Sequence, residues 1–258
     1  MTTPEVLVHR DPATLAAAVA ARLVTRIVDA QSASGYATVC LTGGRIGTAS
    51  LAALAASPAR DAVDWSALHL WWGDERFLPA GDPERNETGA REALLDHVPV
   101  PAENVHAVPA LVPGLDVDEA AARYADDLLR ASRPEDHAPV PTFDVCLLGI
   151  GEDGHVASLF PQQPAVHETE RGAVGVHGAP KPPPERVTLT FPAITASREV
   201  WILGSGAGKA DPVRLALSDA GRVQLPAAGA RGRERTLFLL DEDAAASIPT
   251  KLRRLASP

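Results

Sequence analysis

Cysteine is scarce in this sequence of 258 residues, which contains only Cys40 and Cys146. Both lie inside apolar runs typical of strands, and neither has a basic neighbour that would activate its thiol. We therefore expect two buried free thiols rather than a disulfide or a catalytic cysteine. The zinc motifs C-x-x-C and H-E-x-x-H and the nucleophile elbow G-x-S-x-G are also missing, so the sequence predicts no metal and no other cofactor.

Long hydrophobic runs are absent as well. No apolar run approaches the ~20 residues that a membrane-spanning helix needs, and the first residues lack the apolar core of a secretory signal peptide. These absences predict a cytoplasmic location without membrane attachment. Basic residues are outnumbered, because 24 Lys and Arg stand against 33 Asp and Glu, a net charge of −9. Such a surface argues against a nucleic-acid partner, although a few local cations can hold a small phosphorylated substrate.

The residues that are present have an ordinary balance, 45% hydrophobic and 22% charged, which excludes a disordered, collagen-like or coiled-coil chain. Helices are predicted over 12–31, 48–57, 84–97, 117–132, 207–219 and 242–255, and strands over 36–41, 68–72, 143–150, 187–189, 200–203 and 236–240. Strands that are apolar throughout suit a parallel sheet covered on both faces. We predict a single α/β domain over residues 1–258, doubly wound, with a mainly parallel, Rossmann-like sheet flanked by helices.

Ligands of such folds bind at the carboxyl ends of the strands, so polar residues directly after each strand are the candidates for a site. Gly43 and Gly44 follow the first strand and precede a helix, whose N-terminal N–H groups suit an anion. After the second strand come Asp74 and Arg76, a carboxylate and a guanidinium that suit a polar substrate, with Asn86 in reach of the same place. A purely structural turn and a solvated loop are the alternative interpretations.

The third buried strand leads into the segment 149–158, GIGEDGHVAS, which matches the dinucleotide fingerprint G-x-G-x-x-G. Pro161 and Pro164, however, stop the long helix that such a loop must open. The glycines instead place Asp153 and His155 two residues apart at a strand end. Because histidine transfers protons near neutral pH and a carboxylate orients it, this pair is a candidate acid–base catalyst.

A fourth segment, 204–209 (GSGAGK), resembles a phosphate-binding loop but is followed by Ala210, where a nucleotide hydrolase needs a hydroxyl to hold Mg²⁺. Lys209 in this glycine-rich turn still suits a single phosphate. The stretch 178–186, GAPKPPPER, contains four prolines and predicts a stiff exposed loop that ends in Arg186, a further candidate for the anion site. A solvent-facing lysine and a surface arginine are the alternatives.

Taken from the residues alone, these segments predict a cofactor-free α/β protein with a histidine–aspartate acid–base pair. A second acidic and basic segment and two candidate phosphate-binding turns lie near that pair. The chemistry that such a set supports is the hydrolysis, isomerisation or deamination of a small phosphorylated metabolite.

The order and spacing of these segments resemble the 6-phosphogluconolactonase family over roughly residues 5–245. The resemblance is carried by LTGG, WWGDERF, DPERN, FDVCLLGIGEDGHVASLFP, RVTLTFPAI and GSGAGKADPV. It implies the hydrolysis of 6-phospho-D-glucono-1,5-lactone to 6-phosphogluconate without a cofactor, in the oxidative pentose phosphate pathway. The family often has Ser-Thr-Pro where this sequence has Arg45-Ile46-Gly47.

The resemblance also implies roles for individual residues. His155 is the expected general base that activates water, Asp153 supports it, and Asp74 lines the lactone end of the site. Arg76 is expected beside Asp74, where it also serves the phosphate. The expected phosphate ligands are Lys209, Arg186 and the backbone N–H groups of Gly43 and Gly44.

Two alternatives remain open at this stage. The related glucosamine-6-phosphate isomerase/deaminase carries the same Asp-Gly-His segment, but it has a glutamate five residues after the histidine. Phe160 occupies that position here, so the acid that helps to open the sugar ring is missing and the lactonase is favoured. The other alternative is a non-catalytic sugar-phosphate sensor, against which the intact Asp153 and His155 argue.

Overall fold

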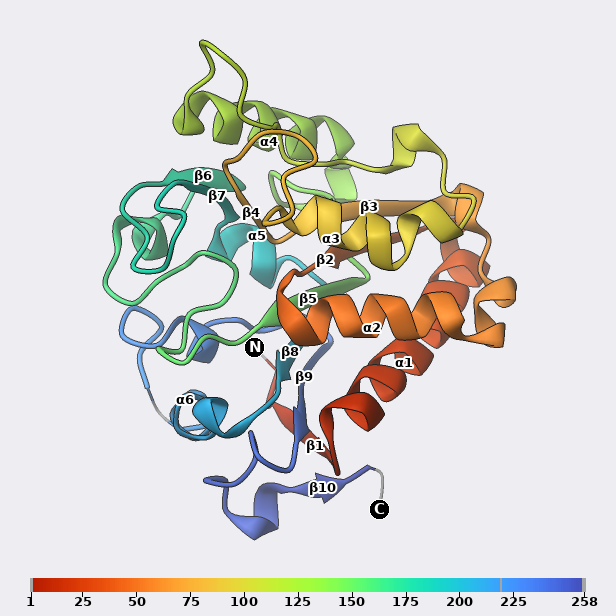
Figure 1. Ribbon diagram of the computed structural model, residues 1–258, viewed down its shortest axis with the longest axis vertical. Coiled ribbons are helices and arrows are strands. Elements are labelled where there is room, and N and C mark those ends of the chain that lie inside the picture. The colour runs from red at the N-terminus through yellow and green to blue at the C-terminus, as the bar shows by residue number, and fades with distance from the viewer. Residues whose placement is uncertain (1, 219, 257–258) are drawn as a thin grey trace.

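A large parallel sheet dominates the computed structural model, which describes residues 2–218 and 220–256 (Figure 1). Within these residues the sheet has seven strands in the order β10-β1-β9-β8-β5-β2-β3, and each neighbouring pair is parallel. The strands are β1 (Glu5–His9), β2 (Ala37–Leu41), β3 (Leu68–Trp72), β5 (Val145–Gly149), β8 (Glu199–Gly204), β9 (Arg235–Asp241) and β10 (Arg254–Leu255). The central strands are buried almost throughout, as their uninterrupted apolar runs predict. The expected α/β fold with a mainly parallel sheet is confirmed.

Helices flank this sheet, with α1 and α2 packed together to its right in Figure 1 and α6 to its left. They are α1 (Pro12–Ser34), α2 (Gly44–Ala56), α3 (Asn86–Ala93), α4 (Val117–Ala131), α5 (Phe191–Thr195) and α6 (Ala210–Ala216). The longest, α1, begins where the Asp11 carboxylate accepts a 2.7 Å hydrogen bond from the N–H of Thr14. It ends at Gly35, whose φ of 83° takes the left-handed conformation that closes a helix.

A small antiparallel sheet stands apart from the large one and was missed by the sequence analysis. Its strands run in the order β4 (Asp74–Arg76), β7 (Arg186–Leu189) and β6 (Ala173–Val176). A three-residue run of charged side chains does not look like a strand, which is why β4 escapes pattern analysis. The pairing has a direct consequence for the site, because Arg76 lies opposite Arg186 in register.

The predicted helix over 242–255 is wrong. This segment forms turns, the 3-10 helix Thr250–Leu252 and the short strand β10, because Pro249 lacks an N–H group and disfavours helical backbone before it. Strand β1 was missed altogether. The helix predicted over 84–97 is shortened to α3. The helix predicted over 207–219 begins as a 3-10 turn and continues as α6. Residue 219, the predicted end of that helix, lies outside the described residues.

The two cysteines lie side by side on neighbouring strands, where Cys40 of β2 is the register partner of Cys146 of β5. Both are buried and free, as predicted. Burial raises the pKa of the Cys40 thiol, which keeps it protonated and unreactive. In the part of the chain that the structure describes, no helix is long and apolar enough to cross a membrane.

The parallel arrangement brings the carboxyl ends of β2, β3, β5 and β8 to one edge of the large sheet. The segments that follow these strands are 42–44, 73–76, 150–158 and 205–209, in that order. The four strand-end segments singled out in the sequence therefore gather at one edge of the fold.

Candidate active site

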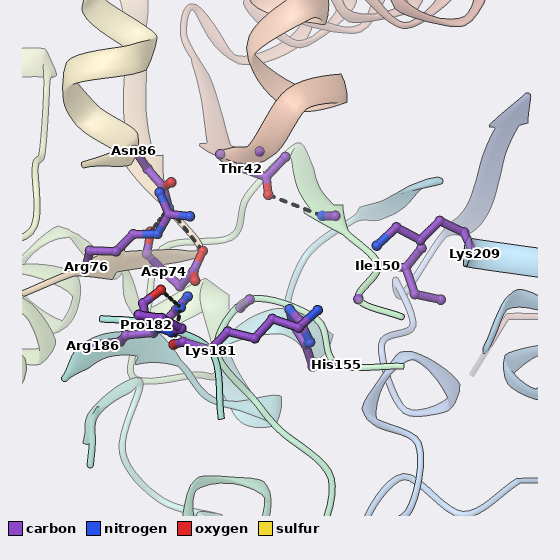
Figure 2. A pocket seen from close by; sticks show the side chains of 15 residues that line it. Thr42, Asp74, Arg76, Asn86, Ile150, His155, Lys181, Pro182, Arg186 and Lys209 are labelled. Carbon is purple, nitrogen blue, oxygen red and sulfur yellow. Dashed lines mark hydrogen bonds between the residues drawn. The ribbon is translucent and has the colours of Figure 1, made fainter. Parts of the chain in front are cut away.

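A cavity of about 300 Å³ opens at this edge of the large sheet (Figure 2). It is lined by seven of the residues predicted for the site, namely Gly43, Gly44, Asp74, Arg76, His155, Arg186 and Lys209. The eighth, Asp153, does not line the cavity but lies directly behind His155. Among the described residues, no cluster of three or more His, Cys, Asp or Glu side chains is arranged to hold a metal ion.

His155 and Asp153 form a hydrogen-bonded pair in which Nδ1 of the imidazole lies 2.5 Å from Oδ1 of the carboxylate. Burial on its own raises the pKa of Asp153, but the hydrogen bond and the charge of His155 outweigh this and lower the pKa to about 2. The carboxylate is therefore ionised near neutral pH. Because an ionised carboxylate only accepts hydrogen bonds, Nδ1 carries the proton and Nε2 keeps the lone pair that a base needs.

The surroundings of the imidazole hold it in one place. Its ring packs against the buried ring of Phe160, with 4.5 Å between the centroids. A Cβ atom at Gly151 would lie 2.0 Å from Nδ1 of His155, so the second glycine of the 149–158 segment is required for this arrangement. After β5 the chain forms turns and the 3-10 helix Pro164–His167, which confirms that this segment does not open a dinucleotide-binding helix.

Asp74 lies at the other end of the cavity and is almost completely buried. Its Oδ2 accepts a 2.6 Å hydrogen bond from the hydroxyl of Ser158, and its Oδ1 accepts one of 3.3 Å from Nδ2 of Asn86. The same amide nitrogen donates to the Asp74 carbonyl at 2.8 Å. Asp74 is thus fixed from two directions where it lines the cavity.

Glu75 turns away from the cavity and organises the chain beneath it. Its carboxylate accepts hydrogen bonds of 2.7–2.8 Å from the backbone N–H groups of Arg76, Asn86 and Glu87, two of which open helix α3. Burial raises the pKa of Glu75, while the buried guanidinium of Arg85, 3.8 Å away, and these N–H groups act in the opposite direction. The middle residue of the Asp-Glu-Arg segment is therefore structural.

The N-terminus of helix α2 faces the cavity without a side-chain cap. Gly43 occupies the cap position and Gly44, with a φ of 77°, follows it. A Cβ atom at Gly43 would lie 1.8 Å from Oδ1 of Asn86, so only glycine allows this close approach. The first N–H groups of an uncapped helix are free to bind an anion.

Two arginines provide positive charge beside Asp74. Arg76 donates from its guanidinium to the carbonyl of Glu84, while its buried Nε atom has no hydrogen-bond partner. Arg186 lies opposite Arg76 on β7 and is 6% exposed. Burial lowers the pKa of Arg186 and the charge of Arg76 lowers it further, whereas the charge of Asp74 raises it.

Lys209 lines the cavity across from Arg76 and Arg186, as Figure 2 shows. Arg45 is close enough to Lys209 for its charge to act on it, and these two residues form a second group of cations. Burial lowers the pKa of Lys209, and the positive charges of Lys181 and Arg45 act in the same direction. The carboxylates of Glu152 and Asp153 oppose this shift. Of the predicted cations, Arg76 and Arg186 thus lie together beside Asp74, and Lys209 lies on the far side of His155.

Sequence reasoning missed Thr42 and Lys181 as cavity residues, and it only suggested Asn86. The Thr42 hydroxyl accepts a 3.2 Å hydrogen bond from the N–H of Gly149 and so joins the ends of β2 and β5. The position of Thr42 directly before the paired glycines could have indicated that it lines the cavity. For Lys181 the sequence offered weaker evidence, namely a lysine inside a run of prolines.

A sequence model described as "Glucosamine-6-phosphate isomerases/6-phosphogluconolactonase" matches residues 10–239. The chain belongs to this family. It is 62% identical to a 6-phosphogluconolactonase of Streptomyces coelicolor over 257 residues, which cover 99% of this chain and 98% of that protein. It is 51% identical to a 6-phosphogluconolactonase of Mycobacterium tuberculosis over 238 residues, covering 92% and 95% of the two chains.

Solved structures of family members share the fold. The 6-phosphogluconolactonase of Trypanosoma brucei superimposes with a TM-score of 0.81 at 30% identity, covering 96% of this chain and all of that one. A monomeric glucosamine-6-phosphate deaminase superimposes with a TM-score of 0.75 at 18% identity, covering 93% and 99%. The second likeness shows the fold alone.

Proposed function

We propose that this chain is a 6-phosphogluconolactonase, which hydrolyses 6-phospho-D-glucono-1,5-lactone to 6-phospho-D-gluconate. The observation that carries this proposal is the His155–Asp153 pair on a cavity with cations at both ends. Membership of the family and the full-length likeness to lactonases support it.

His155 acts as the general base. Its Nε2 atom removes a proton from a water molecule while the water oxygen attacks C1 of the lactone, and Asp153 stabilises the imidazolium that forms. The C1–ring-oxygen bond of the tetrahedral intermediate then breaks, and the imidazolium returns its proton to the leaving ring oxygen. One water is consumed, and C1 becomes a carboxylate once the product acid ionises.

The lactone ring lies at the end of the cavity that holds Asp74 and Arg76. Asp74, held by Ser158 and Asn86, accepts hydrogen bonds from hydroxyl groups of the sugar. Arg76 faces the carbonyl oxygen, which becomes negatively charged in the tetrahedral intermediate. Fixed donors at such a developing charge are commonly the largest contribution to catalysis, and the loss of one costs about 2.7–4 kcal/mol.

The phosphate group binds at the end that holds Lys209 and the N-terminus of α2. Lys209 supplies a charge-assisted hydrogen bond, and the N–H groups at Gly43 and Gly44 supply neutral ones. Arg186 adds positive charge to the cavity wall. Arg45, in the first turn of α2, contributes to the same positive potential.

Phe160 favours the lactonase over a deaminase. Its buried ring packs against His155 at the position where the deaminase motif places a glutamate. A phenyl ring neither donates nor accepts the proton that ring opening of an amino sugar requires. The hydrophobic contact instead fixes the imidazole beside its carboxylate.

The test is lactone hydrolysis with freshly generated substrate, coupled to 6-phosphogluconate dehydrogenase and corrected for spontaneous ring opening. A rate proportional to the amount of protein supports the proposal. A rate equal to the background contradicts it, and ammonia release from glucosamine 6-phosphate then identifies a deaminase. Binding of 6-phosphogluconate without turnover of either substrate identifies a sensor.

We also propose that the chain folds as one domain and acts in the cytoplasm on a small sugar phosphate, without a nucleic-acid partner. Strand β1 lies between β9 and β10, so the large sheet joins distant parts of the sequence and supports a single domain. The two buried free thiols support a reducing compartment. The net charge of −9 opposes nucleic-acid binding.

A further inference from the structure

Arg186 directs its hydrogen bonds toward the proline-rich loop 178–186 and not into the cavity. Its Nε donates to the carbonyl of Pro183 at 3.2 Å. One terminal nitrogen, Nη2, donates to the carbonyls of Lys181 at 2.8 Å and Pro182 at 3.1 Å. Three consecutive carbonyl groups are therefore held by a single guanidinium, itself buried and fixed in strand β7.

The loop that Arg186 holds carries Lys181 to the mouth of the cavity. Prolines flank this lysine and follow it, which restricts the backbone to few conformations. The side chain of Lys181 lines the cavity, and Figure 2 shows it extending from the Arg186 side toward His155. Because Lys181 itself is exposed, its ammonium group stays hydrated at the rim.

The side chain approaches the second group of cations. Lys181 and Arg45 are both close enough to Lys209 for their positive charges to act on it. Like charges gathered around one point repel each other, and an anion bound between them converts that repulsion into attraction. A phosphate dianion is the ligand group that fits this arrangement.

We propose that Lys181 is a further substrate-binding residue, which covers the phosphate from the loop side, and that Arg186 is the positioning residue that holds Lys181 there. This inference rests on the proposed function, because the phosphate is that of the lactone substrate. The proposed role of Arg186 needs more than its positive charge, because it depends on donating hydrogen bonds to several loop carbonyl groups. A lysine in its place keeps the charge but lacks the planar set of donors that holds several carbonyls at once.

The first experiment compares Lys181→Met, Lys181→Arg and the exposed control Lys251→Met. We expect Lys181→Met to raise KM for the phosphorylated lactone about tenfold or more, the effect of losing one charged hydrogen bond. KM for unphosphorylated glucono-1,5-lactone and kcat stay within about twofold, and Lys181→Arg restores most of the loss. Equal effects on both lactones, or a Lys181→Met variant that behaves like Lys251→Met, would overturn the proposal.

The second experiment is a double-mutant cycle with Arg186→Lys. If Arg186 acts through Lys181, Arg186→Lys raises KM for the phosphorylated lactone, and the double variant is no worse than the poorer single variant. Losses that multiply show that Arg186 contributes independently of Lys181 and overturn its positioning role. Thermal unfolding of each variant confirms that it is folded. If Arg186→Lys does not fold, Arg186→Gln replaces it in the cycle, and losses that multiply with those of Lys181→Met again overturn the positioning role.

Calorimetric binding of 6-phosphogluconate separates this proposal from the proposed function. A wild-type protein that binds this product without hydrolysing the lactone contradicts the lactonase activity but still permits the test of Lys181. We expect Lys181→Met to weaken the binding of 6-phosphogluconate about tenfold or more. Unchanged binding by Lys181→Met would overturn the role of Lys181 whether or not the lactone is hydrolysed.

Discussion

Ser158 and Asp74 are 84 positions apart in the sequence, yet the serine hydroxyl donates a 2.6 Å hydrogen bond to the aspartate in the buried wall of the cavity. Ser158 follows β5 of the large sheet, and Asp74 begins β4 of the small sheet. The bond therefore joins the two sheets at the site. Ser158 makes a second bond to the small sheet, because its backbone N–H donates to the hydroxyl of Thr188 in β7 at 3.1 Å.

Ser158→Ala should destabilise the protein by about 1–3 kcal/mol, because a buried carboxylate oxygen loses its hydroxyl donor. Chemical denaturation measures the loss. Ser50→Ala is the matched control, since Ser50 is equally buried but its hydroxyl bonds only to the carbonyl of Ile46 in its own helix. Two variants of equal stability would show that the Asp74 contact contributes nothing.

His155→Ala should lower kcat about 10²- to 10⁴-fold, the usual contribution of a general base, while the melting temperature stays near that of the wild type. The coupled lactone assay measures this change. His177→Ala is the control, because His177 is an exposed histidine that also pairs with an aspartate, Asp118, but does not line the cavity. Near-wild-type turnover of His155→Ala would remove it from the mechanism.

Glu75→Gln should reduce the free energy of unfolding by about 3–5 kcal/mol, because it removes the fully buried one of the two carboxylates that pair with the buried Arg85. The new amide group also presents an N–H toward backbone N–H groups that need an acceptor. Glu87→Gln changes the more exposed partner of the same arginine and should cost clearly less. The hypothesis fails if urea denaturation gives the two variants the same loss.

Stability should fall as the pH drops from about 6.5 toward 4. Burial and the charge of His69 lower the pKa of His106 to about 4, while Asp127 acts in the opposite direction. In this interval the unfolded chain binds a proton at His106 that the folded chain does not, so acid favours unfolding. His106→Phe keeps a ring stacked on Trp71 and should reduce the slope of stability against pH by at most ~1.4 kcal/mol per pH unit.

The control for this prediction is the pH dependence of stability that His106→Phe should keep. Burial also lowers the pKa of His69 and of His9, so the variant keeps a weaker dependence of the same sign. Melting temperatures of both proteins at several pH values between 4 and 8 provide the measurement. Parallel curves would contradict an acid-sensitive His106.

Sequence patterns predicted the large sheet and most of the cavity for one physical reason. Buried parallel strands are continuous apolar runs, and the residues after them must meet at one edge. Asp74, His155 and Lys209 were found in this way. Their roles in catalysis stay predictions until the variants are measured.

Other features depend on contacts that no local pattern carries. Strand β4 is polar and exists because β7 pairs with it across more than a hundred residues of sequence. The helix predicted over 242–255 shows the opposite error, since its favourable composition did not outweigh Pro249. Lys181 was overlooked because its place in the cavity is set by the guanidinium of Arg186, which turns back onto three carbonyl groups of its own loop.

The position of β1 between β9 and β10 has a consequence for the order of events during protein synthesis. Strand β1 leaves the ribosome more than 200 residues before either of its two partners in the sheet. Until Arg235–Asp241 emerges, the backbone of β1 has no strand beside it, and the apolar residues of the nascent strand depend on α1 for cover. Strand β1 is therefore completed only after the segments from α1 to β8 have been made, which makes its pairing a late step in the folding of this sheet.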